Sequence, residues 1–201
     1  MVDVEQAIAA IRAGEPVLLP TDTVYGLCAS PYREEPVARV YRLKGRPDST
    51  PSALLCFDVD TVLECMPDLH GHLAVIARAL LPGGFTLVFP NPSRRYRWLN
   101  GDARDTIGIR VPELKGPARE VLEQVGVVMA TSANRHRGLD PRRLDDVPRE
   151  IRAGCAAEID GGELPGTPST VIDLTGSEPR ILREGVVSAA EALERLAAVP
   201  V

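Results

Sequence analysis

The sequence lacks the long apolar segment that a membrane-spanning helix needs, and it has few aromatic residues. It contains no run of about 18 consecutive apolar residues, which excludes such a helix. Phe, Trp and Tyr make up only 4% of the chain, too few for a protein that stacks a run of nucleic-acid bases. The first residues, MVDVEQAIAAIRAGEP, carry acids where a signal peptide carries basic residues. We therefore expect a cytoplasmic protein that does not contact a membrane.

Cysteine is scarce, and the common metal and catalytic motifs are missing. The chain has no CxxC pair, which is typical of a protein kept reduced. Cys65, His70 and His72 resemble metal ligands, but a fourth ligand is missing and their spacing fits no zinc pattern. We therefore predict no structural metal. There is also no GxxxxGKS/T loop, no GxGxxG after the first strand, no HExxH and no GxSxG, so the familiar nucleotide-binding and hydrolase motifs are excluded.

Lysine is rare in a chain that is rich in other charges. The chain has 23 basic and 28 acidic residues, a net charge of −5. This charge excludes a protein that is basic over its whole surface, but it allows a local basic groove. Lys44 and Lys115 are the only lysines. Because an ammonium and a guanidinium differ in geometry, each lysine is a candidate for a place where arginine would not serve.

The length and the periodicity of the 201 residues predict one α/β or α+β domain over residues 1–201. A chain of this size buries roughly 70% of its unfolded surface. Apolar residues at helical spacing predict helices over 3–13, 36–43, 69–81, 116–125 and 188–197. Apolar runs predict strands of a mixed sheet over 16–20, 52–57, 85–89, 106–111, 125–131, 156–160, 169–174 and 180–183. The polar segment 132–149 is expected to be a loop with a short helix.

Several polar segments stand where a predicted strand or helix ends. PTDTVYGL (20–27) and ATSAN (130–134) offer hydroxyls, a carboxylate and small residues at strand ends, where α/β folds often bind ligands. Thr and Asp also favour helix caps and turns, so a purely structural role stays open. Lys44 and Arg46 flank a glycine and form a cationic pair suited to phosphates, although a lysine at a helix end can also cap it.

Three more segments are candidates for ligand contact. Arg110 lies inside the predicted strand TIGIRV and either points to solvent or lies beside an anion. The glycines of IDGG (159–162) let a loop close on a ligand. The cluster RRYRW (94–98) can contact RNA phosphates or stack a base, or it is a solvated loop.

Taken together and in this order, the segments resemble the TsaC/YrdC family, the threonylcarbamoyl-AMP synthases of tRNA modification. The similarity extends over residues 16–187 and fits the short, single-domain form of the family. The matching elements are PTDTVYGL (20–27), KGRP (44–47), PGGFTLV (82–88), TIGIRVP (106–112), ATSAN (130–134), IDGG (159–162), STVIDLT (169–175) and ILREG (181–185).

The resemblance implies a fold and a reaction. The fold would be a twisted mixed sheet around a basic cavity. The reaction would combine L-threonine, bicarbonate and ATP, with Mg²⁺, into threonylcarbamoyl-AMP and diphosphate. A threonylcarbamoyl-transferase complex would then take the product for tRNA modification, and the basic cavity would also suit tRNA or double-stranded RNA.

The resemblance also assigns roles to residues of this chain. Lys44 and Arg46 would be catalytic, stabilising the charge that develops on the α-phosphate. L-threonine would bind near Thr23, Arg110, Ala130 and Ser169. ATP would lie along Lys44, Arg46, Thr50, Thr106, Ser132, Asn134, Asp140 and Arg183. No residue is assigned as general base.

Five positions depart from the family pattern: Thr50, Leu55, Gly84, His136 and Asp140. These changes are similar to those of divergent relatives such as the YciO-like paralogues. Those paralogues, however, typically lose the Lys-x-Arg and Ser-x-Asn sets, and this chain keeps both. An acid at position 140, where the family often has serine, is odd near ATP phosphates unless it faces a metal. Two alternatives remain: a divergent RNA- or nucleotide-binding protein without threonine-dependent activity, and an interaction domain without a small ligand.

Overall fold

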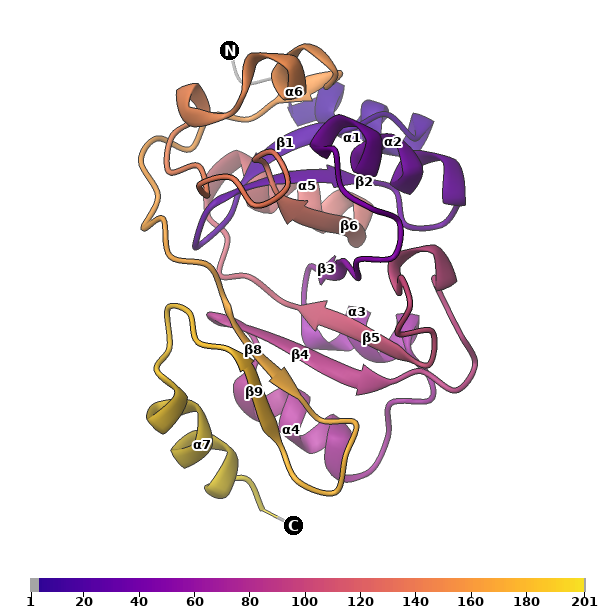
Figure 1. The fold of residues 1–201 in the computed structure, drawn as a ribbon, viewed down its shortest axis with the longest axis vertical. Coiled ribbons are helices and arrows are strands. Elements are labelled where there is room, and N and C mark those ends of the chain that lie inside the picture. The colour runs from indigo at the N-terminus through magenta and orange to yellow at the C-terminus, as the bar shows by residue number, and fades with distance from the viewer. Residues whose placement is uncertain (1–3, 201) are drawn as a thin grey trace.

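A computed structural model describes residues 4–200, which form one mixed sheet with helices on both faces (Figure 1). The strands are β1 (Val17–Pro20), β2 (Tyr25–Ala29), β3 (Ala53–Cys56), β4 (Phe85–Pro90), β5 (Thr106–Arg110), β6 (Val127–Ser132), β7 (Ala157–Glu158), β8 (Thr170–Asp173) and β9 (Arg180–Arg183). The helices are α1 (Val4–Ala13), α2 (Glu34–Lys44), α3 (Val59–Cys65), α4 (His72–Leu80), α5 (Gly116–Val125), α6 (Arg149–Ala153) and α7 (Ala189–Ala197), with short 3-10 turns η1 (Arg97–Leu99) and η2 (Leu144–Asp146).

The nine strands follow the order β7-β1-β2-β6-β3-β5-β4-β8-β9. The pairs β1/β7, β3/β5 and β4/β8 are parallel, and the other neighbours are antiparallel. Strands from the start, middle and end of the chain therefore belong to one sheet, in which β6 separates β2 from β3 and β7 lies beside β1. This confirms the predicted fold class, a twisted mixed sheet with flanking helices.

Two elements differ from the sequence prediction. Residues 25–29 form β2, which pairs back onto β1 through the four-residue turn 21–24, although 25–27 were assigned to the polar segment PTDTVYGL and no strand was predicted there. All five residues of β2 are buried, so its apolar character was hidden by the polar turn before it. The short helix α3 was also missed; Asp58 caps it by accepting a hydrogen bond from the Thr61 N–H at 2.7 Å. The loop 132–149 is confirmed, and its short helices are η2 and, directly after it, α6.

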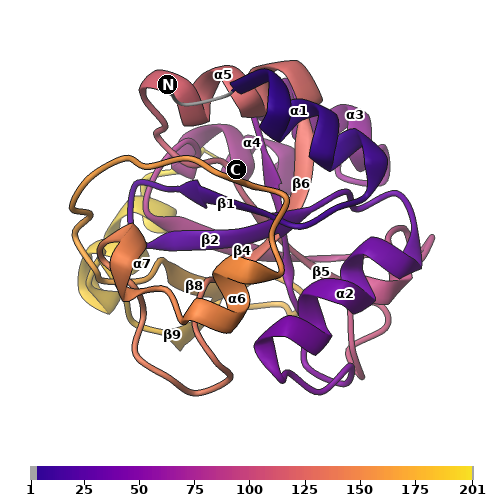
Figure 2. The same cartoon turned by 90° about the horizontal axis from the view of Figure 1, so that it is seen from above.

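Helices cover the two faces of the sheet unequally. Figure 2 shows α1 and α5 together on one side of β1 and β2, with α2 and α6 on the other. Under α1 and α5 lies a small core that includes Ile11, Leu19, Val121 and Val128. The larger core contains residues of α2, α3, α4 and the central strands. Because α1 and α5 reach only part of their face, the rest of that face remains open toward β4 and β8.

No helix within residues 4–200 is both long and apolar enough to cross a membrane.

Candidate active site

A cavity of about 550 Å³ lies on the open part of the sheet. Its floor follows the pleat: Ala130 of β6 pairs with Ala53 of β3, and Ala53 pairs with Gly108 of β5. Side chains two residues apart on a strand share a face, so Arg110 and Leu55 border the same floor. Small side chains at its centre keep the sheet open to a ligand. The charged lining residues are four arginines and two aspartates: Arg46, Arg110, Arg180, Arg183, Asp140 and Asp173.

The turn between β1 and β2 supplies polar groups to one side of the cavity. The Thr21 hydroxyl donates to the Val24 carbonyl at 2.7 Å and accepts the backbone N–H groups of Thr23 and Val24, both at 3.2 Å. This network holds Thr23 next to Arg110, whose Nη2 donates to the Thr23 hydroxyl at 2.9 Å. The tight turn therefore brings a hydroxyl from position 23 to an arginine from a distant strand.

Arg110 is held in a buried ion pair. Its Nη2 donates to Asp22 Oδ1, and Asp22 Oδ2 accepts the Glu113 N–H at 3.2 Å. The side chains of Arg110 and Asp22 are only 9% and 15% exposed. Burial lowers the pKa of Arg110 and Asp22 opposes that shift, so the guanidinium stays charged. Its Nε is buried without a hydrogen-bond partner, which leaves a donor for an incoming anion.

Lys44, at the C-terminus of α2, is buried at the end of β6. Its Nζ donates to the carbonyl oxygens of Ser132, at 2.5 Å, and Asn134, at 3.0 Å. It also donates to the Asn134 side-chain oxygen and to the Ser132 hydroxyl, the latter at 3.2 Å. Burial and the nearby Arg46 lower the pKa of Lys44 to about 8, and Asp140 opposes that shift. The Lys-x-Arg and Ser-x-Asn segments therefore form one network.

Gly45 places Arg46 on the other side of the helix end. Gly45 has φ of 62°, a left-handed conformation that glycine adopts without strain and that ends α2. Arg46 Nη1 donates to the Thr131 hydroxyl at 2.8 Å, and its Nη2 donates to the Pro51 carbonyl. Burial lowers the pKa of Arg46, and its Nε is buried without a hydrogen-bond partner. Arg46 thus lines the cavity while Lys44 lies behind it.

Ser169 and Arg183 close the opposite side. The Ser169 hydroxyl lies 2.7 Å from that of Thr86. Arg183 donates to the Ser169 carbonyl from Nη2 at 2.8 Å and from Nε at 3.2 Å. Burial lowers the pKa of Arg183 while Asp140 raises it. Both residues line the cavity, so the two sides carry cations that face a common space.

The structure brings nearly all of the predicted site residues together. Eight of them line the cavity: Arg46, Thr106, Arg110, Ala130, Ser132, Asp140, Ser169 and Arg183. Thr23, Lys44 and Asn134 lie one hydrogen bond behind that lining. Thr50 is outside the lining, and its N–H donates to the Pro47 carbonyl at 3.0 Å. The roles of these residues stay predictions.

Several residues of the cavity and its surroundings were not predicted from the sequence. Asp22 stood inside a recognised motif, but nothing in the sequence linked it to Arg110. Thr86 was likewise inside a motif, and its partner is 83 residues away. Asp173 stood inside the motif STVIDLT, but neither its place in the cavity lining nor its ion pair with Arg180, at 2.5 Å, was predicted. Asp22 and Thr86 acquire their partners only when segments 88 and 83 residues apart in the chain meet, whereas Asp173 and Arg180 are paired neighbours on β8 and β9.

Two other predicted features have clear positions. In the cluster 94–98, the Trp98 indole N–H donates to the Pro31 carbonyl at 2.7 Å, and Arg94 pairs with Asp105 at 2.7 Å. The Trp98 ring packs against the core, so base stacking there would require it to leave that contact. Within residues 4–200, no three His, Cys, Asp or Glu side chains gather where they could hold a metal ion.

Comparisons with known proteins agree with this geometry. The family model of Sua5, YciO and YrdC, described as "Telomere recombination", matches residues 9–185. A Mycobacterium tuberculosis protein provisionally named as a threonylcarbamoyl-AMP synthase is 34% identical over 96% of this chain and 87% of its own length. The threonylcarbamoyl-AMP synthase of Pyrococcus abyssi is 32% identical over 89% of this chain and 53% of its own length. The chain thus spans about half of that longer relative.

Solved structures show the same likeness. The crystal structure of P. abyssi Sua5 complexed with L-threonine matches with a TM-score of 0.87 and 31% identity, over 98% of this chain and 57% of that one. The crystal structure of E. coli YciO matches with a TM-score of 0.80 and 27% identity, over 91% of this chain and 89% of that one. The resemblance found in the motifs is confirmed: the chain belongs to the Sua5/YciO/YrdC family.

Proposed function

We propose that this chain is an L-threonylcarbamoyladenylate synthase, a nucleotidyltransferase that joins L-threonine, bicarbonate and ATP into threonylcarbamoyl-AMP and releases diphosphate. The observation that carries the proposal is the meeting of two recognition sets in one cavity. Arg110 has an unpaired Nε for a carboxylate, and Arg46 and Arg183 line the same cavity as cations suited to phosphates, with Lys44 behind the lining. The names of the P. abyssi relative and of its threonine complex support this assignment.

The amino acid binds on the side of the cavity that holds Arg110. Its carboxylate accepts hydrogen bonds from the guanidinium, while Thr23 and Ser169 offer hydroxyls and the backbone at Ala130 offers a polar group. Leu55 borders the same side and provides apolar contact for the substrate side chain. The amine must be neutral to capture carbon dioxide or bicarbonate, and we assign no side chain to that proton.

The nucleotide binds along Arg46, Thr106, Ser132 and Arg183, with Lys44 behind them. A carbamate oxygen attacks the α-phosphorus, a P–O bond forms, and the bond to diphosphate breaks. Negative charge grows on the phosphate oxygens during this step, and preorganised cations stabilise it without a covalent enzyme intermediate. Mg²⁺ bound with the nucleotide would supply further charge neutralisation.

Pyrophosphate release tests the proposal directly. ATP, Mg²⁺ and bicarbonate are supplied with L-threonine, with L-serine or with no amino acid, and threonine-dependent release is expected. Lys44→Ala should abolish release, whereas Lys115→Ala, which removes the only other lysine at an exposed helix start, should leave it unchanged. Release with serine alone would keep the chemistry and change the substrate.

A folded sample that releases no diphosphate with any amino acid would refute the proposal. The alternative, an RNA- or nucleotide-binding protein without this activity, would then predict salt-dependent RNA affinity. Substitution of Arg94, Arg95 and Arg97 by alanine would weaken that affinity without affecting nucleotide binding. Transfer of the product to tRNA by a partner complex, and a cytoplasmic location, stay part of the same proposal.

A further inference from the structure

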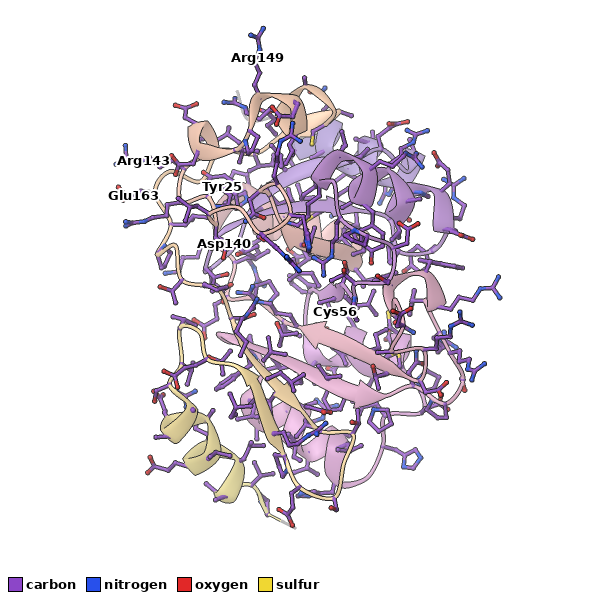
Figure 3. All side chains as sticks on the ribbon, viewed as in Figure 1. Tyr25, Cys56, Asp140, Arg143, Arg149 and Glu163 are labelled. Atoms are coloured by element: carbon purple, nitrogen blue, oxygen red, sulfur yellow. The ribbon has the colours of Figure 1, made fainter. Side chains whose placement is uncertain are left out.

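Asp140 is one of two described carboxylates in the lining of the cavity, and it lies on its nucleotide side. It follows β6 on the loop before α6, and Figure 3 labels it below Tyr25, to the left of the centre of the view. Its charge acts on both Lys44 and Arg183 and opposes the fall in pKa that burial causes in each. An acid therefore sits among the cations that we assign to ATP.

The two oxygens of this carboxylate have different surroundings. Oδ1 accepts a hydrogen bond from Asn134 Nδ2 at 3.0 Å. Oδ2 has no hydrogen-bond donor among residues 4–200. Asp173, the other aspartate in the lining, is different: its Oδ1 accepts from Thr175 and its Oδ2 accepts from Arg180 at 2.5 Å. One acid is fully paired by protein groups, and the other keeps an oxygen for something else.

Asn134 ties Asp140 to the proposed catalytic lysine. The Asn134 side-chain oxygen accepts from Lys44 Nζ and from the Ser132 hydroxyl, the latter at 2.8 Å. Its Nδ2 donates to Asp140 and to the Gly138 carbonyl, the latter at 2.6 Å. All polar groups of the amide are engaged, so the carboxylate is oriented by the same side chain that holds the lysine. This arrangement is typical of a ligand fixed by a neighbouring hydrogen bond.

The charges decide what the free oxygen can meet. A bare triphosphate carries about four negative charges and would be repelled by Asp140, whereas a divalent cation between them turns the repulsion into attraction. Mg²⁺ commonly binds through one or two carboxylates, substrate phosphates and water. We propose that Asp140 Oδ2 is the protein ligand of a divalent cation that enters with the nucleotide. The inference rests on the proposed ATP site. Because the described residues include no group of three His, Cys, Asp or Glu side chains that could hold a metal, this cation would bind only together with the phosphates.

The test measures binding rather than turnover. The affinity for α,β-methylene-ATP, which cannot be cleaved at the reacting bond, is measured by calorimetry with Mg²⁺ and with EDTA. Asp140→Asn keeps the shape and an oxygen for Asn134 but removes the charge, and Asp173→Asn is the matched control in the same cavity. Mn²⁺ spectra by electron paramagnetic resonance, with and without the analogue, report the metal directly. Circular dichroism at the assay temperature verifies that both variants are folded.

For the unmodified chain we expect Mg²⁺ to tighten the analogue by about tenfold or more, the scale on which a metal ligand acts. In Asp140→Asn the metal-free affinity should rise, because repulsion is gone, and the gain from Mg²⁺ should fall to about twofold. Asp173→Asn should keep the full gain. The Mn²⁺ spectrum should change on addition of the protein only when the analogue is present, and the change should be smaller with Asp140→Asn than with the unmodified chain.

If Asp140→Asn increased the affinity for the analogue by the same factor with and without Mg²⁺, the inference would be overturned, since Asp140 would then only neutralise charge on Lys44 and Arg183. So would an unchanged response to Mg²⁺. Failure of the unmodified chain to bind the analogue under both conditions would instead refute the ATP site on which the proposed function depends. The two failures are thus distinguishable.

Discussion

The ion pair of Asp22 and Arg110 offers a test of how the amino-acid side of the cavity is built. Asp22→Ala leaves the guanidinium without its anion at a place where the arginine side chain is 9% exposed. Removing one partner of a buried pair costs about 3–5 kcal/mol. The remaining bond from Arg110 to Thr23, at 2.9 Å, and the open cavity place the expected loss at the lower end, about 3 kcal/mol.

Urea unfolding followed by circular dichroism measures this loss as a change in the free energy of unfolding. In a domain of this size each kcal/mol shifts the melting temperature by about 2–4 °C, so a fall of about 6–12 °C is expected. Asp22→Asn keeps the shape and separates the effect of charge. Asp105→Ala is the control, because the pair of Arg94 and Asp105 is 60% and 66% exposed, and its loss should cost less than about 1 kcal/mol.

Ligand binding gives the same prediction a second readout. If the carboxylate of L-threonine binds Arg110, it replaces the anion that Asp22→Ala removes. L-threonine should then raise the melting temperature of the variant by more than it raises that of the unmodified chain. A loss of stability no larger than that of Asp105→Ala would refute the reasoning, since the pair would then behave as a surface contact.

The other predictions concern Lys44, the closely packed Gly185 and the Ser169 hydroxyl. Because the pKa of Lys44 is lowered to about 8, the affinity for α,β-methylene-ATP should weaken about tenfold between about pH 7 and 9 as the cation is lost, and Lys44→Met should bind weakly at both values. Gly185→Ala should lower the free energy of unfolding by about 1–3 kcal/mol, because the new Cβ would lie 2.2 Å from the Pro168 carbonyl oxygen. Since this clash is beside Ser169, the variant should also raise the KM for threonine. Gly176→Ala is the control: the nearest atom to its Cβ is 3.7 Å away, and urea unfolding should show no change. Ser169→Ala leaves the Thr86 hydroxyl unpaired and should raise the KM for threonine about tenfold without changing the KM for ATP, and equal changes in both constants would contradict the assignment.

The sequence by itself determined the fold class and most of the residues of the site. Apolar periodicity predicted five of the helices and eight of the strands, because burial selects those patterns locally. The order of the motifs led to the family, and Lys44 and Arg46 were singled out by the rarity of lysine and the glycine between them. Strand β2 and helix α3 were missed because each directly follows a polar residue or turn, the turn 21–24 before β2 and the cap Asp58 before α3.

Only the tertiary structure decided which of these residues meet. Arg110 could have pointed to solvent, and its burial beside Asp22 depends on the strand order β2-β6-β3-β5, which brings it to the turn 21–24. Asp173 and Arg180 enter the cavity only because β8 pairs with β4. The free oxygen of Asp140 is visible only once Asn134 is seen to occupy the other one. Side-chain partners far apart in the chain depend on register and twist, which act over the whole sheet and leave no local pattern in the sequence.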